Sequence, residues 1–369
     1  MADDLPLTSP AWTPLPGPAA ASSPSSLRWA VRLPPGTPSP AQIALATAAL
    51  PDPAARAAVA AFLRPADRAR SLASRLLQAA APAAALPGVG WGAAPLARTA
   101  KGGKPFLDFN NSAWAAPPRL PAWRAAAAPN WNFNVSHDGA WAALAADPSA
   151  LVGVDVAAPP VERAGGSFAR LRGLTELRAD FGGCLAPSEW AAVERAGAGA
   201  GAAGGAAARL AAEDSAFRAH WALKEAYTKA RGDGLGCDFG GVVFEGVVVA
   251  GAADAGREGG GGGGSGAGVP GWAAAPLAPP TLLPSRPTLP AHPAWAFELH
   301  ALDGPGGHIL ALARGPAAQA VDEGGALART FLAPGAACLS PDRLPFTPLA
   351  MRDLLPDGAR GAYDAAGGE

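Results

Sequence analysis

The chain has 369 residues, a length that predicts about two domains, and its 47 glycines and 40 prolines predict low-complexity stretches. It contains neither a strict Gly-X-Y repeat nor a run of about 18 strongly apolar residues, which excludes a collagen and a membrane-spanning protein. The net charge of −1 provides no overall attraction to nucleic acid or to an acidic membrane surface, so we expect neither as a partner.

The N-terminal segment, residues 1–26, is rich in Pro, Ser and Ala, and we expect it to be disordered. Its start, Met1–Asp4, has neither the basic and apolar regions of a secretory signal nor the Arg-rich composition of a transit peptide. The three cysteines, Cys184, Cys237 and Cys338, form no CxxC pair, which favours a reducing compartment and gives no zinc site. We therefore expect a cytosolic protein.

Hydrophobic periodicity predicts the elements of an N-terminal half. Residues 28–33 alternate like a strand, and apolar residues at helical spacing predict helices over 41–50 and 53–82. A short strand at 133–136 ends in a turn, and a further strand follows at 140–146. These elements predict a first α/β subdomain over residues 27–147.

A second α/β subdomain is predicted over residues 148–315. It opens with a strand at 151–156, followed by a helical stretch over roughly 159–230. We expect the Ala/Gly run at 196–208 to interrupt that stretch as a loop, and a clear helix from Glu213 to Ala230 to end at Gly232.

The C-terminal part of the sequence is more irregular. Strands are predicted at 242–244 and 247–249, and a hairpin at 295–299 and 308–313. Between them, a Gly/Pro-rich insert over about 251–293 is expected to be a linker without chemistry, and residues 316–369 are expected to be a low-complexity tail. Mixed α/β structure in two modest halves is the predicted fold class.

Three segments contain residues suited to chemistry, and the first is a basic loop. Arg98, Lys101 and Lys104 lie within seven residues, together with glycines that let backbone N–H groups approach an anion. The loop lacks the spacing of a Walker P-loop. It is either an anion site or an ordinary solvated basic loop.

The second segment is a strand end followed by an apolar strand with one charge. Asn134, Ser136 and His137 enter a turn closed by Asp138-Gly139, which is either a site or an ordinary hairpin. Asp155 is the single charged residue of the apolar strand that follows. A buried carboxylate is costly unless it is paired or binds a metal, so Asp155 is either a ligand or a solvent-facing residue at the strand end.

The third segment is the helix over residues 217–230. Trp221, Glu225 and Lys229 are spaced i, i+4, i+8 and share one helical face. Taken alone, the pattern fits either a functional acid and base or a surface ion pair beside a core tryptophan.

Together, the three segments resemble the Sfp-type 4′-phosphopantetheinyl transferases in order and type, over roughly residues 28–315. The residues that carry the resemblance are Arg98–Pro105, Asn132–His137, Val152–Asp155, Trp221–Lys229 and Gly232–Gly236. Two features depart from the family pattern. The basic loop has one extra glycine, and Ala157 stands where bacterial members have a second carboxylate, as in the animal-like branch.

The resemblance implies two similar α/β subdomains related by a pseudo-two-fold axis, and a monomer. It also implies Mg²⁺-dependent transfer of the phosphopantetheine arm of coenzyme A to a serine of an apo acyl or peptidyl carrier protein, releasing adenosine 3′,5′-bisphosphate. Asp155 and Glu225 are then the metal ligands, and Asp155, Glu225 and Lys229 the catalytic residues. The residues expected to bind coenzyme A are Arg98, Lys101, Lys104, Asn134, Ser136, His137, Glu225 and Lys229.

Some alternatives stay open at this point. The base for the incoming serine is either Glu225 or a metal-bound water. A catalytically silent module that binds coenzyme A or carrier protein is the main rival function, and an unrelated Mg²⁺-dependent phosphoryl transferase is a second one.

Overall fold

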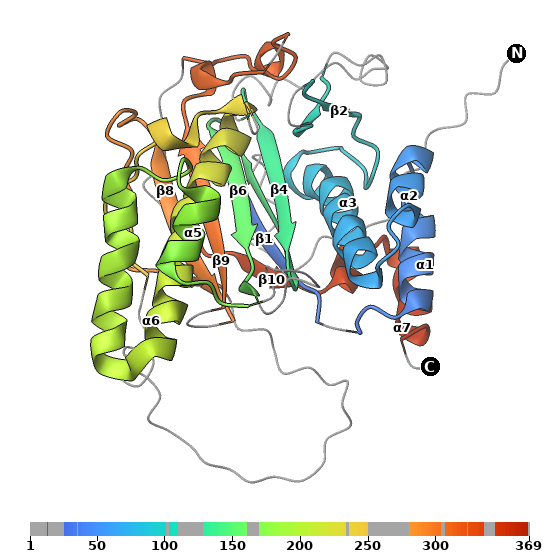
Figure 1. Cartoon of the computed structure of the whole chain (residues 1–369). Coiled ribbons are helices and arrows are strands. Elements are labelled where there is room, and N and C mark those ends of the chain that lie inside the picture. Colours follow the sequence, from blue (N-terminus) through green and yellow to red (C-terminus); the bar gives the residue numbers. More distant parts are fainter. Residues whose placement is uncertain are drawn as a thin grey trace, which may run out of the picture.

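The computed structural model describes residue 13 and the ranges 26–34, 36–100, 103–109, 128–160, 170–233, 236–249, 280–303, 307–322, 324–335 and 344–367. Two four-stranded sheets lie in the middle of the molecule, and helices lie on the outer side of each sheet (Figure 1). Within these ranges, no helix combines the length and the apolar character needed to cross a membrane.

The N-terminal half is built on the first sheet. Its elements are β1 (Leu27–Arg32), α1 (Pro40–Ala49), α2 (Pro53–Ala60), α3 (Pro65–Ala85), β2 (Leu96–Arg98), β3 (Pro105–Leu107), β4 (Asn132–Asp138) and β5 (Trp141–Asp147). The strand order is β10-β1-β5-β4, in which β10 (Thr347–Leu349) pairs parallel to β1 and the other pairs are antiparallel. Helix α3 packs against β5 and β4, while α7 (Asp357–Ala365) packs against α1.

The C-terminal half is built on the second sheet. Its elements are β6 (Leu151–Ala157), α5 (Leu174–Phe181), α6 (Pro187–Arg231), β7 (Thr281–Leu282), β8 (Ala296–Leu302) and β9 (His308–Gly315). The strand order is β6-β9-β8-β7, with antiparallel pairing throughout, and α6 packs against β6 and β9. Short 3₁₀ turns lie at Phe239–Gly241, Ala317–Gln319, Ala328–Thr330 and Met351–Leu354.

The two halves repeat one arrangement. In each, the first strand pairs antiparallel with the second strand of a hairpin, which gives β1-β5-β4 in one half and β6-β9-β8 in the other. In each, helices connect the first strand to the hairpin and cover the outer face. The mixed α/β fold of two similar halves is confirmed.

A row of side-chain hydrogen bonds joins the edge strands β4 and β6. Every second residue of β4 accepts from a backbone N–H of β6. The pairs are Asn132 with Val152 (3.1 Å), Asn134 with Val154 (2.8 Å), Ser136 with Val156 (3.2 Å) and Asp138 with Ala158 (2.9 Å). Unpaired buried N–H groups are costly, so these side chains complete an edge that no neighbouring strand covers. We call this row the β4–β6 ladder.

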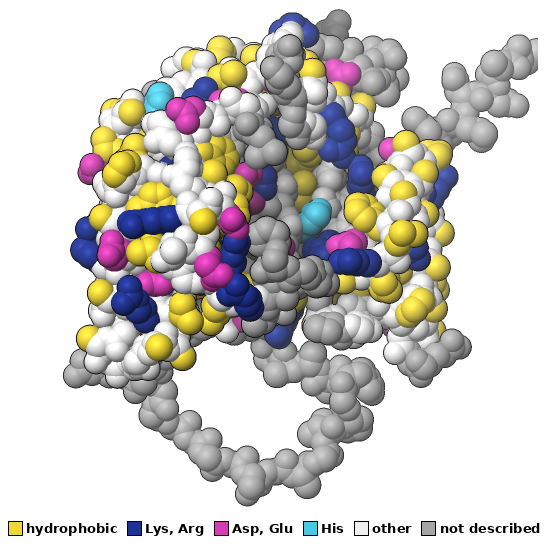
Figure 2. Space-filling model, viewed as in Figure 1, with side chains coloured by type: hydrophobic (Ala, Val, Ile, Leu, Met, Phe, Trp, Pro, Cys, Tyr) yellow, Lys and Arg dark blue, Asp and Glu magenta, His cyan; other side chains and the backbone are white. Residues whose placement is uncertain are grey.

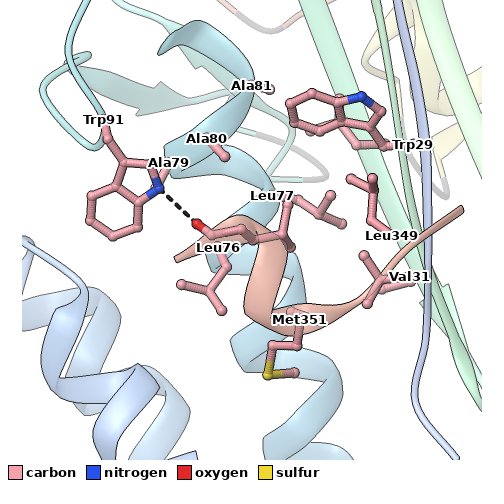
Figure 3. Packing of buried hydrophobic residues seen from close by; sticks show 14 of the residues in the cluster. Trp29, Val31, Leu76, Leu77, Ala79, Ala80, Ala81, Trp91, Leu349 and Met351 are labelled. Carbon is pink, nitrogen blue, oxygen red and sulfur yellow. Dashed lines mark hydrogen bonds between the residues drawn. The ribbon is translucent and has the colours of Figure 1, made fainter. Parts of the chain in front are cut away.

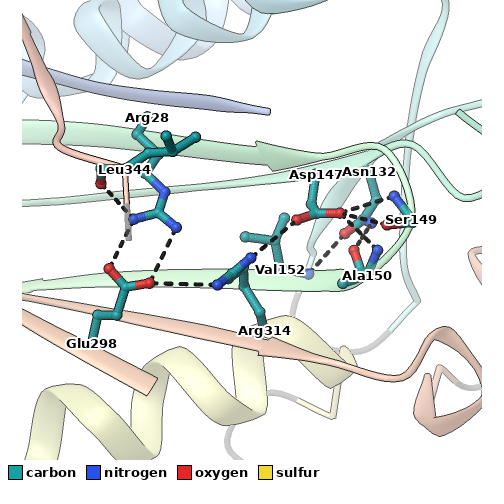
Figure 4. Close-up of polar contacts among 9 residues, drawn as sticks. All are labelled: Arg28, Asn132, Asp147, Ser149, Ala150, Val152, Glu298, Arg314 and Leu344. Atoms are coloured by element: carbon teal, nitrogen blue, oxygen red, sulfur yellow. Dashed lines mark hydrogen bonds and ion pairs between the residues drawn. The ribbon is translucent and has the colours of Figure 1, made fainter. Parts of the chain in front are cut away.

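A buried ion-pair network also spans the two halves (Figure 4). Arg28 on β1 donates to both carboxylate oxygens of Glu298 on β8, at 2.8 and 3.1 Å, and to the carbonyl of Leu344. Arg314 on β9 lies 3.7 Å from Glu298 and 3.9 Å from Asp147. Burial alone would raise the pKa of Glu298, but the hydrogen bonds from His300 and Arg28 lower it to about 2.

The prediction of one helix over 53–82 is wrong, because the segment forms two helices. Helix α2 ends at Ala60, and α3 starts at Pro65. The residue before a proline is driven out of the helical region, and Arg64 has extended backbone angles (φ −82°, ψ 132°).

The Ala/Gly run at 196–208 does not form the predicted loop. It is helical except at Gly205 (φ 77°, ψ −166°), where the chain reverses, so α6 is a helical hairpin (Figure 1). Alanine is the strongest helix former, and a positive φ suits glycine. The two arms touch where Gly197 faces Glu213 and Gly201 faces Arg209, positions at which a side chain would crowd the partner. The predicted end of the second arm at Gly232 is confirmed.

The strands predicted at 242–244 and 247–249 are absent from the described residues. Only an isolated bridge between Glu245 and Thr288 forms there. Gly246 turns the chain with φ 69°, and Pro287 has no N–H to donate.

The predicted linker packs into the core at its C-terminal end. Leu283 and Leu289 are buried against α6 and β8, and β7 extends the second sheet. Residues 250–279 lie outside the described ranges, so the prediction for that part has no structural counterpart.

The prediction of a low-complexity tail from residue 316 is wrong for the described part. Strand β10 completes the first sheet, and Met351 and Leu354 pack under α3 (Figure 3). The indole N–H of Trp91 donates to the carbonyl of Leu354 at 2.8 Å. The N-terminal half is therefore discontinuous in sequence. Of the segment 1–26, only Thr13, which donates to Asp357, and Ser26 are described.

Candidate functional site

Three elements bring a carboxylate, an ammonium and a hydroxyl to one point. Lys229 on α6 donates to an oxygen of Asp155 on β6 at 2.5 Å and to the hydroxyl of Ser136 on β4 at 3.1 Å. Ser136 also donates to Asp155 at 3.0 Å. Asp155 is buried, and burial raises its pKa, while its carboxylate raises the pKa of Lys229. Asp155 is thus a buried carboxylate and not a solvent-facing residue.

Glu225 lies one helical turn before Lys229, on the same side of α6. It is half-buried, and within the described ranges its carboxylate has neither a hydrogen bond nor an ion pair. Burial raises the pKa of Glu225; the charge of Lys229 opposes this shift, and the charge of Asp155 adds to it. Lys229 pairs with Asp155 rather than with Glu225, which argues against a simple exposed i, i+4 ion pair on this helix.

The chemistry of this pair of acids suits a hard divalent cation. Two neighbouring carboxylates, one of them without a partner among the described residues, lie beside a basic pocket. Mg²⁺ commonly uses one or two carboxylates and completes its shell with phosphate oxygens and water. The described residues contain no group of three or more His, Cys, Asp or Glu side chains suited to a metal, so two ligands are the most this site provides.

A glycine explains how β6 and α6 come so close. A Cβ at Gly153 would lie 2.0 Å from the carbonyl oxygen of Ala226 and 2.4 Å from the nitrogen of Ala230. Only a residue without a side chain allows this approach. It places Asp155, two residues later on the same strand face, against the helix that carries Glu225 and Lys229.

A pocket of about 270 Å³ opens beside the acids, between α3, β4 and the β2–β3 turn. Its polar walls include Arg75, Gln78, Arg98, His137 and Lys229. In the view of Figure 2, basic, acidic and histidine side chains gather on the face between the two halves. A second cavity of about 540 Å³ shares Arg75, Gln78 and Arg98 with the first. This lining suits a ligand with several negative charges.

His137 and Arg98 lie where the sequence places an anion site. Both line the pocket, and Arg98 also donates to the carbonyl of Gly103 at 2.9 Å. Partial desolvation, followed by the charges of Arg70 and Lys229, lowers the pKa of His137. Desolvation and the nearby charge of Arg75 lower the pKa of Arg98. Clustered cations lower one another's pKa values, and an anion between them would relieve this repulsion.

The remaining predicted anion-binding residues have structural partners or lie outside the described ranges. The side-chain oxygens of Asn134 and Ser136 belong to the β4–β6 ladder, although Asn134 also borders the pocket. Lys104 borders the pocket too, but its ammonium donates to two backbone carbonyls. Lys101 lies outside the described residues.

The sequence analysis missed a polar stripe on α3. Ser71, Ser74, Arg75 and Gln78 follow i, i+3, i+4, i+7 spacing on α3, and all four line the pocket. Within the described ranges, Arg75 has neither a hydrogen bond nor an ion pair. The spacing itself is the signal that could have revealed the stripe.

Lys224, next to Glu225 in the helix motif, belongs to the core. Its ammonium lies 2.6 Å from Glu189, both side chains are fully buried, and it donates to the carbonyls of Phe239 and Val242. Its contacts join the second arm of α6 to Glu189 on the first arm and to the loop after α6, and none of them is with Asp155 or Glu225.

Comparisons with known proteins agree with this geometry. Residues 36–149 match a family described as 4′-phosphopantetheinyl transferase, N-terminal, and residues 152–248 match the 4′-phosphopantetheinyl transferase superfamily. Together the two matches cover more than half of the chain. The boundary between them falls at the β5–β6 turn.

Individual relatives carry related names. An L-aminoadipate-semialdehyde dehydrogenase-phosphopantetheinyl transferase of Xenopus laevis is 32% identical over 223 residues, 60% of this chain and 62% of the relative. Its counterpart in Rattus norvegicus is 29% identical over 219 residues, 59% of this chain and 60% of the relative. A phosphopantetheinyl transferase of Thraustochytrium is 33% identical over 106 residues, 29% of this chain and 32% of the relative. The chain thus spans about three fifths of the length of the two animal relatives.

Proposed function

Because this chain belongs to the 4′-phosphopantetheinyl transferase superfamily, we propose that it transfers the phosphopantetheine arm of coenzyme A to a serine of an apo carrier protein. Adenosine 3′,5′-bisphosphate is the second product of this reaction. The observation that carries the proposal is the pocket lined by cations, one of which, Lys229, contacts Asp155.

The pocket supports coenzyme A as the donor. The nucleotide part of coenzyme A has a pyrophosphate and a 3′-phosphate, and both need cationic partners. Arg75, Arg98 and His137 line the pocket, and Lys229, which also lines it, contacts Asp155. This distribution of cations favours a position of the 3′-phosphate near Arg75, Arg98 and His137, and of the pyrophosphate near Lys229.

The acids support a Mg²⁺ requirement. Asp155 and Glu225 would hold the ion, with phosphate oxygens and water as its other ligands. When bound, Mg²⁺ neutralises charge on the pyrophosphate, which phosphoryl-group chemistry needs more than covalent help from the protein.

The residues of the chain account for the other requirements. Lys229 provides a point charge that is shared between Asp155 and the pocket. Glu225 is one candidate base for the carrier serine, and a water on the metal would be the other. A cytosolic location and a monomeric state belong to the same proposal and rest on the sequence alone.

The test is incubation with coenzyme A, Mg²⁺ and assorted apo carrier proteins, followed by intact mass measurement. We expect one carrier to gain one phosphopantetheine arm, and the gain to vanish when its acceptor serine is replaced by alanine. Chelation of Mg²⁺ should also abolish it. Tight binding of coenzyme A without any mass gain would instead identify a silent binding module.

A further inference from the structure

We propose that Lys104 is a positioning residue, whose ammonium fixes strand β6 to the end of helix α6 and thereby sets the geometry of Asp155, Glu225 and Lys229. The inference rests on the proposed function and goes beyond it, because it gives this residue of the basic loop a role other than binding phosphate.

The contacts of Lys104 define the role. Its Nζ donates to the carbonyl oxygen of Val152 on β6 at 3.0 Å and to that of Ala230 on α6 at 2.8 Å. The side chain is buried, at 5% exposure, and two of its three protons are committed to these carbonyls. Burial also lowers the pKa of Lys104 to about 7, which agrees with an ammonium removed from solvent.

Both acceptors lie close in sequence to the proposed catalytic residues. Val152 precedes Asp155 by three residues on the same strand, and Ala230 directly follows Lys229. The Ala230 carbonyl belongs to the last turn of α6, where carbonyls lack helical partners and carry partial negative charge. One ammonium therefore satisfies an open carbonyl on the strand and another on the helix, at the place where Gly153 brings the two together.

The loop that delivers Lys104 is itself held in one conformation. The backbone N–H of Lys104 donates to the hydroxyl of Thr99, and the N–H of Thr99 donates to the carbonyl of Lys104, both at 3.0 Å. Gly103 makes the turn with φ 59°, and Arg98 donates to its carbonyl. The same loop thus presents Arg98 to the pocket and Lys104 to the seam between β6 and α6.

This arrangement separates two functions within one short loop. Arg98 lines the pocket and can reach a phosphate directly. Lys104 has a strand and a helix as its partners, so its loss changes the relative placement of the catalytic groups. A phosphate ligand affects the affinity for the nucleotide, whereas a positioning residue affects the rate once the nucleotide is bound.

The experiment compares Lys104→Met, which keeps the aliphatic stem, with Arg98→Met. Calorimetry gives the Kd of adenosine 3′,5′-bisphosphate, and transfer to an apo carrier protein gives kcat. For Lys104→Met we expect a Kd within about twofold of wild type and a kcat reduced by about tenfold or more. For Arg98→Met we expect a Kd raised by about tenfold. A raised Kd with unchanged kcat in Lys104→Met would overturn the proposal.

Asn130→Ala controls for the general cost of removing a buried donor. Asn130 is fully buried and also donates to two carbonyls, those of Ser149 and Ala333, away from the acids. We expect this variant to lose stability and to keep wild-type kcat. Should Lys104→Met fail to fold, Thr99→Val, which removes the hydroxyl that holds the Lys104 backbone, is expected to lower kcat in the same direction without raising Kd. An unchanged kcat in Thr99→Val would then count against the proposal.

Hydrogen exchange separates this proposal from the proposed function. We expect Lys104→Met to speed amide exchange at residues 152–155 and 228–231, whereas Arg98→Met should not. Hydrogen exchange is measured without transfer activity. If the wild-type protein transferred nothing, the proposed function would be wrong, but the exchange comparison would still test the placement role of Lys104. Unchanged exchange at both segments would contradict the role of Lys104.

Discussion

The ammonium of Lys229 lies 2.5 Å from a carboxylate oxygen of Asp155, and this contact joins α6 to β6 at the end of the basic pocket. Lys229 therefore lines the basic pocket and also contacts one of the two acids. It gives the two carboxylates different surroundings, because Asp155 has a cationic partner and Glu225 has none among the described residues.

Replacing Glu225 by Gln should abolish transfer without lowering stability. The Glu225 carboxylate has no hydrogen bond or ion pair within the described ranges, and its pKa is raised chiefly by burial, so a neutral amide avoids the cost of burying a charge. Single-turnover transfer and thermal melts of the same variant measure both effects. A wild-type rate with a lower melting temperature would show that Glu225 has a purely structural role.

The raised pKa of Glu225 also predicts how the free energy of unfolding changes with pH. A carboxyl group whose pKa is raised in the folded state binds more protons folded than unfolded, so its contribution falls as pH rises through that range. Glu225→Gln should therefore gain stability relative to wild type as pH rises above the ordinary glutamate pKa. Urea unfolding at several pH values measures this difference, and a gap independent of pH would contradict it.

Glu298 should behave in the opposite way. Its pKa of about 2 lies below the ordinary value of 4.5, so its stabilising effect is complete above about pH 4.5 and is lost as pH falls towards 2. The shift corresponds to stabilisation on the order of 3 kcal/mol at neutral pH. Glu298→Gln should lose this acid dependence and should also leave Arg28 without its bidentate partner. Denaturant midpoints between pH 3 and pH 7 provide the measurement.

His137→Ala should weaken coenzyme A binding far more than binding of 3′-dephospho-coenzyme A. Only the first ligand has the 3′-phosphate that we place near His137 and Arg98. Because the pKa of His137 is lowered, the preference for the 3′-phosphate should grow as pH falls below the ordinary histidine value of 6.5. Calorimetric titrations with the two ligands, at neutral and mildly acidic pH, decide this. Equal losses for both ligands would place His137 elsewhere.

Arg75→Met tests the stripe on α3 that the sequence did not reveal. Arg75 lines both cavities and repels Arg98, so we expect the Kd of adenosine 3′,5′-bisphosphate to rise by about tenfold. Stability should be unchanged or slightly higher, since a like-charge contact is removed. Arg56→Met is a suitable comparison, because Arg56 lines neither cavity and, within the described ranges, donates to the carbonyls of Leu50 and Pro51. An unaltered Kd in Arg75→Met would remove α3 from the anion site.

Local patterns predicted much of the fold and the acids, but not the direction in which each polar residue points. Asp155 was identifiable because a single charge in an apolar strand needs a reason, and Lys229 because helical spacing is regular. The sequence did not indicate that the Lys104 ammonium and the Ser136 hydroxyl contact backbone atoms of β6, because local spacing does not show which distant strand a side chain faces. Residues 196–208 are helical and do not form the predicted loop, because the helix propensity of alanine outweighs the glycine content of this segment.

The β4–β6 ladder determines which substitutions this seam can tolerate. Its bonds run from β4 side chains to β6 backbone N–H groups, which are the same for every amino acid except proline. Polar positions on β4, such as Asn132 and Asn134, are therefore constrained in chemical type. The side chain of Val154, by contrast, lies in the core between the sheets, so an exchange for isoleucine changes the packing there but keeps the N–H that donates to Asn134. A mutational scan should find the ladder positions of β4 intolerant of apolar residues, and the facing positions Val152, Val154 and Val156 intolerant mainly of proline and of charge.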